Sequence, residues 1–509
     1  MDTATAIPNI IHSEVASLGQ PSSLIIGTIS ALLVFAALAS MFLIGEDVFN
    51  SLRAASGKLR SLKLDSESLI ISVSLLSILS ITAAALLFER AKGLFLVLLL
   101  TSFAVSDALI SGISEGSLLI RYLFMIILIT VGICSFNSVQ KRGLSSIQWL
   151  GLIYLLWQLI GLLVNGYGTT SLLLLPVQLG IFVGILIGLS NDYARKIDHL
   201  QFCHILGAIG IGLTAFHATA LILAPQPFLA GRFKSYYLLP TNFANGYAPL
   251  LVAILWLAMH EKGRFVNTLA WATLPIGLGL LILSGTRNSI LIVFVAVIVF
   301  SVIWPKKIMV LVVVGALLTI PLLVLLVNDT SQINGIFKRF SKLEASNRHD
   351  VWALAWNYIM QRPLLGYGIG KGGEVLGQTL QSWEKAEYIN THNAYLGVWL
   401  QHGIIGLTLV GMIILSGLIK GSRMLFSRNV HSDYKKVVIL PVALLAGLAT
   451  GGMFEEYLTS RGSVQQILWG FSLLMISTAT KSFSFTSIQP EDSKILPRAG
   501  SLKYALFGR

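Results

Sequence analysis

The chain has 509 residues, of which 55% are hydrophobic and only 12% charged, and its mean hydropathy is +0.79. A soluble protein of this size carries about 25% charged residues, so the composition excludes an ordinary soluble enzyme and predicts an all-α polytopic membrane protein. The net charge of +13 fits basic cytoplasmic loops rather than nucleic-acid binding, and two cysteines exclude a disulfide framework.

Apolar runs of about 20 residues predict membrane-spanning helices along almost the whole chain. The basic loop at 45–68 conflicts with strict alternation of the loops, so we expect 12 to 14 spans. The candidates are 24–44, 69–88, 93–111, 118–136, 147–164, 171–190, 203–224, 243–259, 268–284, 288–304, 307–327, 394–416, 437–458 and 463–480.

Lysine and arginine gather in alternate loops from the fourth span onward, and these loops are expected to be cytoplasmic. The long loop 328–393 then lies outside the cytoplasm and is expected to contain short helices. The organisation predicted from this pattern is 1–224 for N-terminal spans, 225–416 for a core that includes the long loop, 417–480 for C-terminal spans, and 481–509 for a basic cytoplasmic tail.

Lysine and arginine are expected mainly in cytoplasmic loops. Cations on the predicted outer face are exceptions to this rule and therefore mark candidate sites. Arg232 and Lys234 lie in the connection 225–242, and Arg287 begins a helix after the tight turn L-S-G-T-R-N-S. A helix N-terminus disfavours a cation, so Arg287 is expected to have an anionic partner. The alternative is that these arginines only meet lipid phosphates.

The long loop contains a second signal. Arg348, Trp352, Trp356 and Ile359 recur at helical spacing, and Arg362-Pro363 ends the element. Such a helix is expected to lie flat at the membrane surface, with tryptophan at the interface. The glycines that follow match no phosphate-binding loop, and a flexible lid or an irregular loop is expected there.

His392 immediately precedes an apolar helix. A helix N-terminus favours neutral imidazole over imidazolium, which suits a general base. The alternative is a capping or interfacial histidine. His217 and His402 lie within spans and are expected to be packed or hydrogen-bonded.

Other charged residues lie within or at the ends of spans. Arg121 and Asp107 are expected to pair, because neither can face lipid. Glu455 and Glu456 end the span 437–458 and are expected to pair with Arg461 or with an arginine of the site.

Three motifs in this order resemble the bacterial O-antigen ligase and O-antigen polymerase superfamily. They are L-S-G-T-R-N-S before an apolar helix, then R-H-D-V-W…R-P-L-L-G-Y-G-I-G, then T-H-N-A-Y-L…G-I-I-G. The upstream G-R-F-K…L-P-T-N-F-A-N is similar to the family's segment, with Pro-Thr-Asn in place of Pro-Asn. The resemblance covers about 225 to 415.

The resemblance implies a membrane glycosyltransferase that uses a polyprenyl-diphosphate-linked glycan on the periplasmic face of the bacterial inner membrane. It implies that His392 is the base, that Arg232 and Arg287 hold the diphosphate, and that direct displacement inverts the anomeric carbon. Lys234, Arg348, Arg362 and Asn393 are possible contacts to glycan or phosphate. With no metal-ligand cluster on this face, we expect no metal and no cofactor.

Several functions remain open at this point. A ligase, slightly favoured by the single compact loop, would use a lipid A-core acceptor, a polymerase another glycan, and an oligosaccharyltransferase a protein. The last class would place metal ligands near Glu46 and Asp47. A transporter using Arg121, Asp107 and His217 is the alternative of another class. The expected partners are the lipid-linked donor, the acceptor and membrane lipid, with no nucleic acid.

Overall fold

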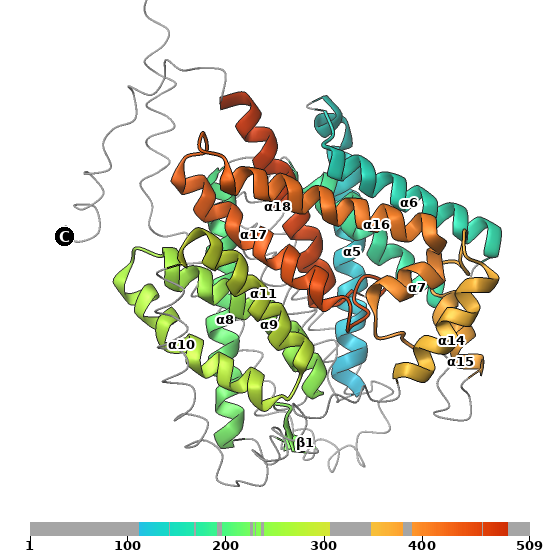
Figure 1. Ribbon diagram of the computed structural model, residues 1–509, viewed down its shortest axis with the longest axis horizontal. Coiled ribbons are helices and arrows are strands. Elements are labelled where there is room, and N and C mark those ends of the chain that lie inside the picture. The colour runs from blue at the N-terminus through green and yellow to red at the C-terminus, as the bar shows by residue number, and fades with distance from the viewer. Residues whose placement is uncertain are drawn as a thin grey trace, which may run out of the picture.

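The computed structural model describes residues 111–141, 143–166, 169–190, 196–223, 228–229, 231–235, 239–305, 348–379, 389–460 and 462–486. This part of the chain is almost entirely helical, as predicted (Figure 1). The predicted spans 24–44, 69–88 and 307–327, nearly all of 93–111, and the tail after residue 486 lie outside it, as do Glu46, Asp47 and Asp107.

Helices follow one another with short connections. The elements in chain order are α5 (Ser111–Lys141), α6 (Ser146–Asn165), α7 (Thr169–Leu179) continuing as the wider η2 (Gly180–Gly188), α8 (Lys196–Leu223), β1 (Phe228–Leu229), β2 (Arg232–Phe233), α9 (Pro240–His260), α10 (Arg264–Leu283), α11 (Arg287–Ile303), α14 (Arg348–Gln361), α15 (Lys371–Thr379), α16 (Ala394–Phe426), α17 (Ser432–Gly451) and α18 (Val464–Thr486).

Seven of these helices are long and apolar enough to cross a membrane: α6, α7 with η2, α8, α9, α10, α16 and α17. Shorter apolar stretches lie in α5 and α11. Ten predicted spans therefore coincide with observed helices, including α5, α11 and α18. The prediction for 437–458 is wrong at its end, because α17 stops at Gly451 and the chain turns back through 452–463.

The helices pack in two groups joined by α17 and α18. Helices α8 to α11 lie together on one side, and α6, α7 and the long α16 lie on the other (Figure 1). Small residues permit the closest approach, since a side chain at Gly184 or Gly188 of η2 would collide with Leu128 or Gly132 of α5. Such small-residue contacts suit membrane helices, whose association depends on close packing rather than on a hydrophobic driving force.

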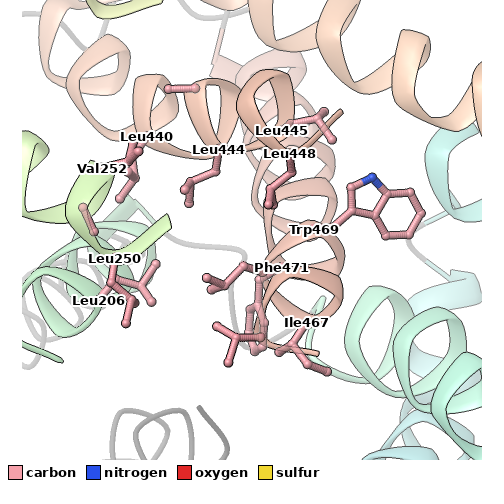
Figure 2. Packing of buried hydrophobic residues seen from close by; sticks show 14 of the residues in the cluster. Leu206, Leu250, Val252, Leu440, Leu444, Leu445, Leu448, Ile467, Trp469 and Phe471 are labelled. Atoms are coloured by element: carbon pink, nitrogen blue, oxygen red, sulfur yellow. The ribbon is translucent and has the colours of Figure 1, made fainter. Parts of the chain in front are cut away.

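The joint between the two groups is a continuous apolar core. Leu444 and Leu448 of α17 lie near Ile467 and Phe471 of α18, and Leu206 of α8, beside Leu250 of α9, belongs to the same core (Figure 2). All six side chains are buried. This core fixes the position of the C-terminal end of α17, around which the candidate site is built.

The spans alternate in direction, so that the described helix ends gather on two faces. One face, here called the basic face, brings the end of α18 to the start of α6, where Lys481 bonds to Gln148 at 3.2 Å. The end of α9 meets the start of α17 there, through the Trp256 indole N–H and the Lys436 carbonyl at 2.5 Å. The opposite face, here called the site face, carries the β-hairpin, α14 and α15 at the lower side of Figure 1.

Helix α16 is broken near its N-terminal third. Gly403 has φ +65° and ψ −175°, which interrupts the helix between residues 402 and 404. The backbone groups freed by the break are bonded by the segment 362–370, here called the glycine segment. The Ile404 N–H donates to the Pro363 carbonyl at 2.8 Å, and the Tyr367 N–H donates to the Leu400 carbonyl at 2.9 Å. The glycine segment is thus an irregular loop, one of the two expected alternatives, and it is fixed to α16.

The break at Gly403 yields a stability prediction. A side chain at this position would collide with the Leu364 carbonyl, and φ is in the left-handed region that favours glycine. Gly403→Ala should therefore cost about 3 kcal/mol of stability, seen as a lower unfolding midpoint of the purified protein in detergent.

The matched control is Gly411→Ala in the same helix. A Cβ added there meets nothing within 4 Å and should raise helix propensity by about 1 kcal/mol at most. Equal unfolding midpoints for the two variants would contradict the role assigned to the break.

Candidate functional site

A short β-hairpin delivers Arg232 to the site face. Strands β1 and β2 pair antiparallel, with Leu229 opposite Arg232, around Gly231 at φ +72°. Phe233 is fully buried against Phe243 of α9, with ring centroids 5.2 Å apart. Burial of this aromatic ring fixes the hairpin and aims the neighbouring arginine toward the start of α11.

The Arg232 guanidinium binds the turn that precedes Arg287. Its Nε donates to the Ser284 carbonyl at 2.7 Å, and its Nη2 donates to Thr286 Oγ1 at 2.9 Å. Gly285, at φ +62°, forms the turn between them. The structure therefore brings together the two arginines that the sequence analysis assigned to one role, although they lie 55 positions apart in the chain.

Arg287 is the first residue of α11 and its side chain is exposed. The helix start is fixed from behind, because Ser289 Oγ donates to Asn245 Oδ1 of α9 at 2.7 Å. The expected anionic partner is not present among the described residues, where no carboxylate forms an ion pair with Arg287. A cation at a helix N-terminus, beside a second guanidinium, forms a strongly positive position that favours a polyanion.

His392 lies at the start of α16, as predicted. Asn393 caps this helix, and its Oδ1 accepts hydrogen bonds from the N–H groups of Tyr395 and Leu396, both at 3.0 Å. His392 itself has φ +51°, a left-handed conformation that is uncommon for a residue other than glycine. Its Nδ1 has no hydrogen-bond partner within the described part of the chain, and Glu455 Oε1 lies 3.9 Å from it.

Glu456 is buried and bonds to Thr391, the residue before His392. Its Oε2 accepts from the Thr391 N–H at 2.5 Å and from Thr391 Oγ1 at 2.7 Å, and its Oε1 accepts from Thr459 Oγ1 at 2.7 Å. Burial raises the pKa of the Glu456 carboxyl, while the bonds from both threonines and the nearby imidazole oppose that rise.

The C-terminal end of α17 joins the two halves of the site. The Ala394 N–H donates to the Gly452 carbonyl at 2.7 Å, which attaches the start of α16. On the other side Gly451 packs so closely against Asn288 and Ile292 of α11 that a side chain would not fit. Arg287 begins α11 and His392 lies two residues before α16, and both of these helices contact the same end of α17.

Two of the predicted additional contacts lie at the same end of α17. Arg348, the first residue of α14, donates from Nη1 to the Phe454 carbonyl at 3.0 Å, next to Glu455. Asn393 uses its side-chain oxygen as the helix cap, so that a substrate contact would fall to its amide nitrogen.

The other two predicted contacts differ from each other. Lys234 follows Arg232 on the hairpin and is half-buried. Arg362 lies elsewhere, donating from Nη1 to Asn165 Oδ1 of α6 at 2.9 Å and covering the Tyr367 ring at 5.0 Å. Lys371 also bonds to Asn165, so this second basic group belongs to the contact between α6, α14 and α15.

The sequence analysis missed the two acids near His392: Glu455, which lies near its ring, and Glu456, which bonds to Thr391. Glu455 and Glu456 were expected at the end of a membrane span, opposite an arginine; Arg461 lies outside the described residues. The structure ends α17 earlier, at Gly451, and places both acids in the loop 452–463. The Gly451-Gly452 pair and the two adjacent acids were the available signals, but nothing in the sequence connected them to Thr391.

His217 and His402 were expected to be packed or hydrogen-bonded within their helices. His217 is buried in α8, where its Nδ1 lies 2.7 Å from Ser235 Oγ and its ring contacts Phe243. His402 is buried in α16, and its ring contacts Tyr154. Both histidines are packed as predicted. The helix predicted from residue 348 is also present, as α14.

Residues 272–411 match the protein family described as O-antigen ligase. The match begins in α10 and ends in α16, so it includes Arg287, Arg348 and His392 but neither Arg232 nor the loop of Glu456. No curated protein matches the chain. The class defined here is a multi-pass membrane protein with a cationic site at the ends of its helices.

The matched segment is about a quarter of the chain. Within it, the match supports the resemblance to the O-antigen ligase superfamily that the sequence analysis predicted. It supports a role in glycosyl transfer, with glycan and lipid-linked substrates in general.

Proposed function

We propose that this protein transfers a glycan from a polyprenyl diphosphate to a hydroxyl group of an acceptor, on the periplasmic face of the bacterial inner membrane. The observation that carries the proposal is the arrangement around α17. Arg232 and Arg287 meet at one turn before α11, and His392 lies just before α16, a helix whose start is bonded to the end of α17 that α11 also contacts.

The two arginines suit the leaving group. Breaking the bond between the anomeric carbon and the diphosphate oxygen leaves an additional negative charge on the diphosphate. Fixed cations stabilise that charge most where it develops, and guanidinium groups bind phosphate oxygens in a bidentate manner. Arg232 is held by Ser284 and Thr286, so little reorganisation is required of it during the reaction.

His392 suits the role of general base. The acceptor hydroxyl gives its proton to the imidazole while its oxygen forms the new bond to the anomeric carbon, opposite the departing diphosphate. This direct displacement inverts the configuration. The proton then passes from the imidazole to solvent. Glu455 Oε1 lies 3.9 Å from Nδ1 of the same ring.

The acceptor separates two versions of this proposal. A ligase delivers the glycan to lipid A-core, and a polymerase delivers it to another lipid-linked glycan. We favour the ligase because the matched family is described as O-antigen ligase. Analysis of the product formed from a lipid-linked donor, with each acceptor supplied in turn, decides between them.

The role of His392 is tested best with asparagine, because asparagine tolerates the left-handed backbone. His392→Asn should fold as well as the wild type and bind the lipid-linked donor normally. It should lose about 10²- to 10⁴-fold in transfer rate, the usual scale for general-base catalysis. Unfolding midpoint, donor Kd and transfer rate are measured on the same preparation; a folded variant with full activity removes His392 from the mechanism.

The role of Arg287 differs because it binds the donor. Arg287→Ala should weaken donor binding by about 10- to 100-fold and also slow transfer, since leaving-group charge rises in the transition state. Arg287→Lys should restore only part of both, because a point charge cannot replace a bidentate fork.

Arg362→Ala is the control for Arg287. It removes the same charge from the same face, but its guanidinium is bonded to Asn165, and donor binding should stay within about threefold of the wild type. Equal losses in the two variants would indicate a general electrostatic effect of the site face instead of a specific diphosphate contact.

The orientation rests on the charges of the basic face. Cations outnumber acids at the described helix ends and connections of this face: Lys262, Arg264, Lys420, Arg423, Arg428, Lys435, Lys436 and Lys481 against Asp198, Glu261 and Asp433. The positive-inside rule assigns such a face to the cytoplasm. The site face would then be periplasmic.

Two single cysteines test this orientation in a background that carries Cys134→Ser and retains the buried Cys203. Thr379→Cys, exposed at the end of α15, should react with an impermeant maleimide in intact spheroplasts. Ser432→Cys, exposed at the start of α17, should react only after the membrane is opened. The reverse pattern would invert the proposed topology.

A further inference from the structure

The short segment Thr391-His392-Asn393 is held on both sides of the histidine. On the C-terminal side, Asn393 caps α16. On the N-terminal side, Thr391 is held by Glu456, whose Oε2 accepts both its backbone N–H and its hydroxyl. The Thr391 hydroxyl also lies 2.8 Å from the Asn393 carbonyl. The backbone of His392 is therefore fixed by its two neighbours, not by contacts of its own side chain.

The Glu456 carboxylate is itself a fixed point. Its side chain is only 6% exposed, and Thr459 holds the second oxygen. The next residue, Tyr457, is buried and donates its hydroxyl to the Leu448 carbonyl of α17 at 2.7 Å. The loop is thus attached to the helix end on which the start of α16 also rests.

The chemistry of the partners favours a carboxylate here. The Thr391 N–H and the Thr459 hydroxyl donate to Glu456, and the one hydrogen of the Thr391 hydroxyl can go to Glu456 or to the Asn393 carbonyl. A carboxylate accepts at both of its oxygens. A glutamine has nearly the same shape but would place an NH₂ group against one of these donors. Hydrogen bonds to a charged acceptor are also shorter and stronger than neutral ones.

The conformation of His392 shows what this arrangement achieves. A left-handed backbone is unfavourable for a residue with a Cβ, and residues in such conformations persist only where the surroundings determine them. With φ at +51°, the imidazole leaves the chain in a direction that a right-handed or extended residue could not give it. If Thr391 were released, His392 could relax and its ring would move.

From this geometry we infer that Glu456 is a positioning residue for the base. It holds Thr391, and through Thr391 it keeps His392 in the conformation that presents the imidazole to the acceptor hydroxyl. Glu456 does not touch the substrate, and the inference rests on the proposed role of His392 as the base. It differs from Glu455, whose carboxylate lies near the imidazole itself.

A positioning role predicts a particular kinetic signature. Displacement of a catalytic group by about 1 Å can cost about 10²-fold in rate, whereas diphosphate binding at Arg287 does not involve Thr391. Glu456→Gln should therefore lower kcat by about 10- to 100-fold while the Kd of the lipid-linked donor stays within about twofold. A merely structural role would lower the amount of folded protein without this separation of kcat from binding.

Two threonines provide a matched pair of variants. Thr391→Val and Thr459→Val each remove one hydroxyl that donates to Glu456 at 2.7 Å, but only Thr391 adjoins His392. We expect Thr391→Val to lower kcat by about 10-fold or more and Thr391→Ser to restore most of it. Thr459→Val leaves the bonds between Glu456 and Thr391 in place, so it should lose clearly less kcat than Thr391→Val at a comparable unfolding midpoint. Unfolding midpoints in detergent and donor Kd are measured for every variant.

The outcomes separate this inference from the proposed function. If His392→Asn is inactive but Glu456→Gln and Thr391→Val keep the full kcat, Glu456 is not a positioning residue and the proposed function stands. Equal kcat losses in Thr391→Val and Thr459→Val, in proportion to their unfolding midpoints, would also overturn the inference. A fully active His392→Asn overturns the proposed function, and the inference with it. If Glu456→Gln does not fold, the threonine pair decides.

Discussion

The hydrogen bond from the Ala394 N–H to the Gly452 carbonyl is the contact on which the site depends. It joins the start of one helix to the end of another, and thereby satisfies one free donor and one free acceptor of the kind that every helix end exposes. At Gly451 the same end of α17 packs closely against the side chains of Asn288 and Ile292 of α11. The proposed base His392 and the proposed diphosphate contact Arg287 consequently follow the position of one helix end, although they belong to distant parts of the chain.

In this arrangement some residues hold the backbone in place, and the residues next to them carry the proposed chemistry. Thr391, Asn393 and Glu456 are engaged with backbone and with one another, while the side chains of His392 and Arg287 make no hydrogen bond within the described residues. Rigid partners of this kind matter in a transfer reaction, because a base or a cation that must first reorganise contributes less to the rate. The left-handed backbone conformation of His392 is energetically unfavourable, and it sets the direction of the imidazole ring.

Much of the fold could be predicted from the sequence, because long apolar runs determine membrane helices almost by themselves. The positions of Arg287 and His392 near helix starts could be predicted for the same reason, and α14 from the helical spacing of its tryptophans. The end of α17 was predicted seven residues too late, since Met453 and Phe454 continue the apolar run although the glycines before them end the helix.

The contacts within the site could be predicted only in part. That Arg232 and Arg287 act together followed from a family resemblance, and their connection through Thr286 required a hairpin that no local pattern indicates. The contact between Glu456 and Thr391 joins residues 65 positions apart. It depends on how two loops meet in space, and neither residue type signals such a meeting.

The break at Gly403 also decides how high the site stands above the bilayer. The part of α16 after the break, residues 404–426, is about 34 Å long at 1.5 Å per residue, which is sufficient to cross a hydrocarbon core of about 30 Å. The nine residues before the break are therefore not needed for crossing, and they carry His392 as an arm whose depth is set by the bend. A lipid diphosphate floats at the level of the headgroups, and its anomeric carbon lies only one bond beyond. Lengthening or shortening this arm by one turn would move His392, the proposed base, by about 5.4 Å relative to the proposed lipid-linked donor.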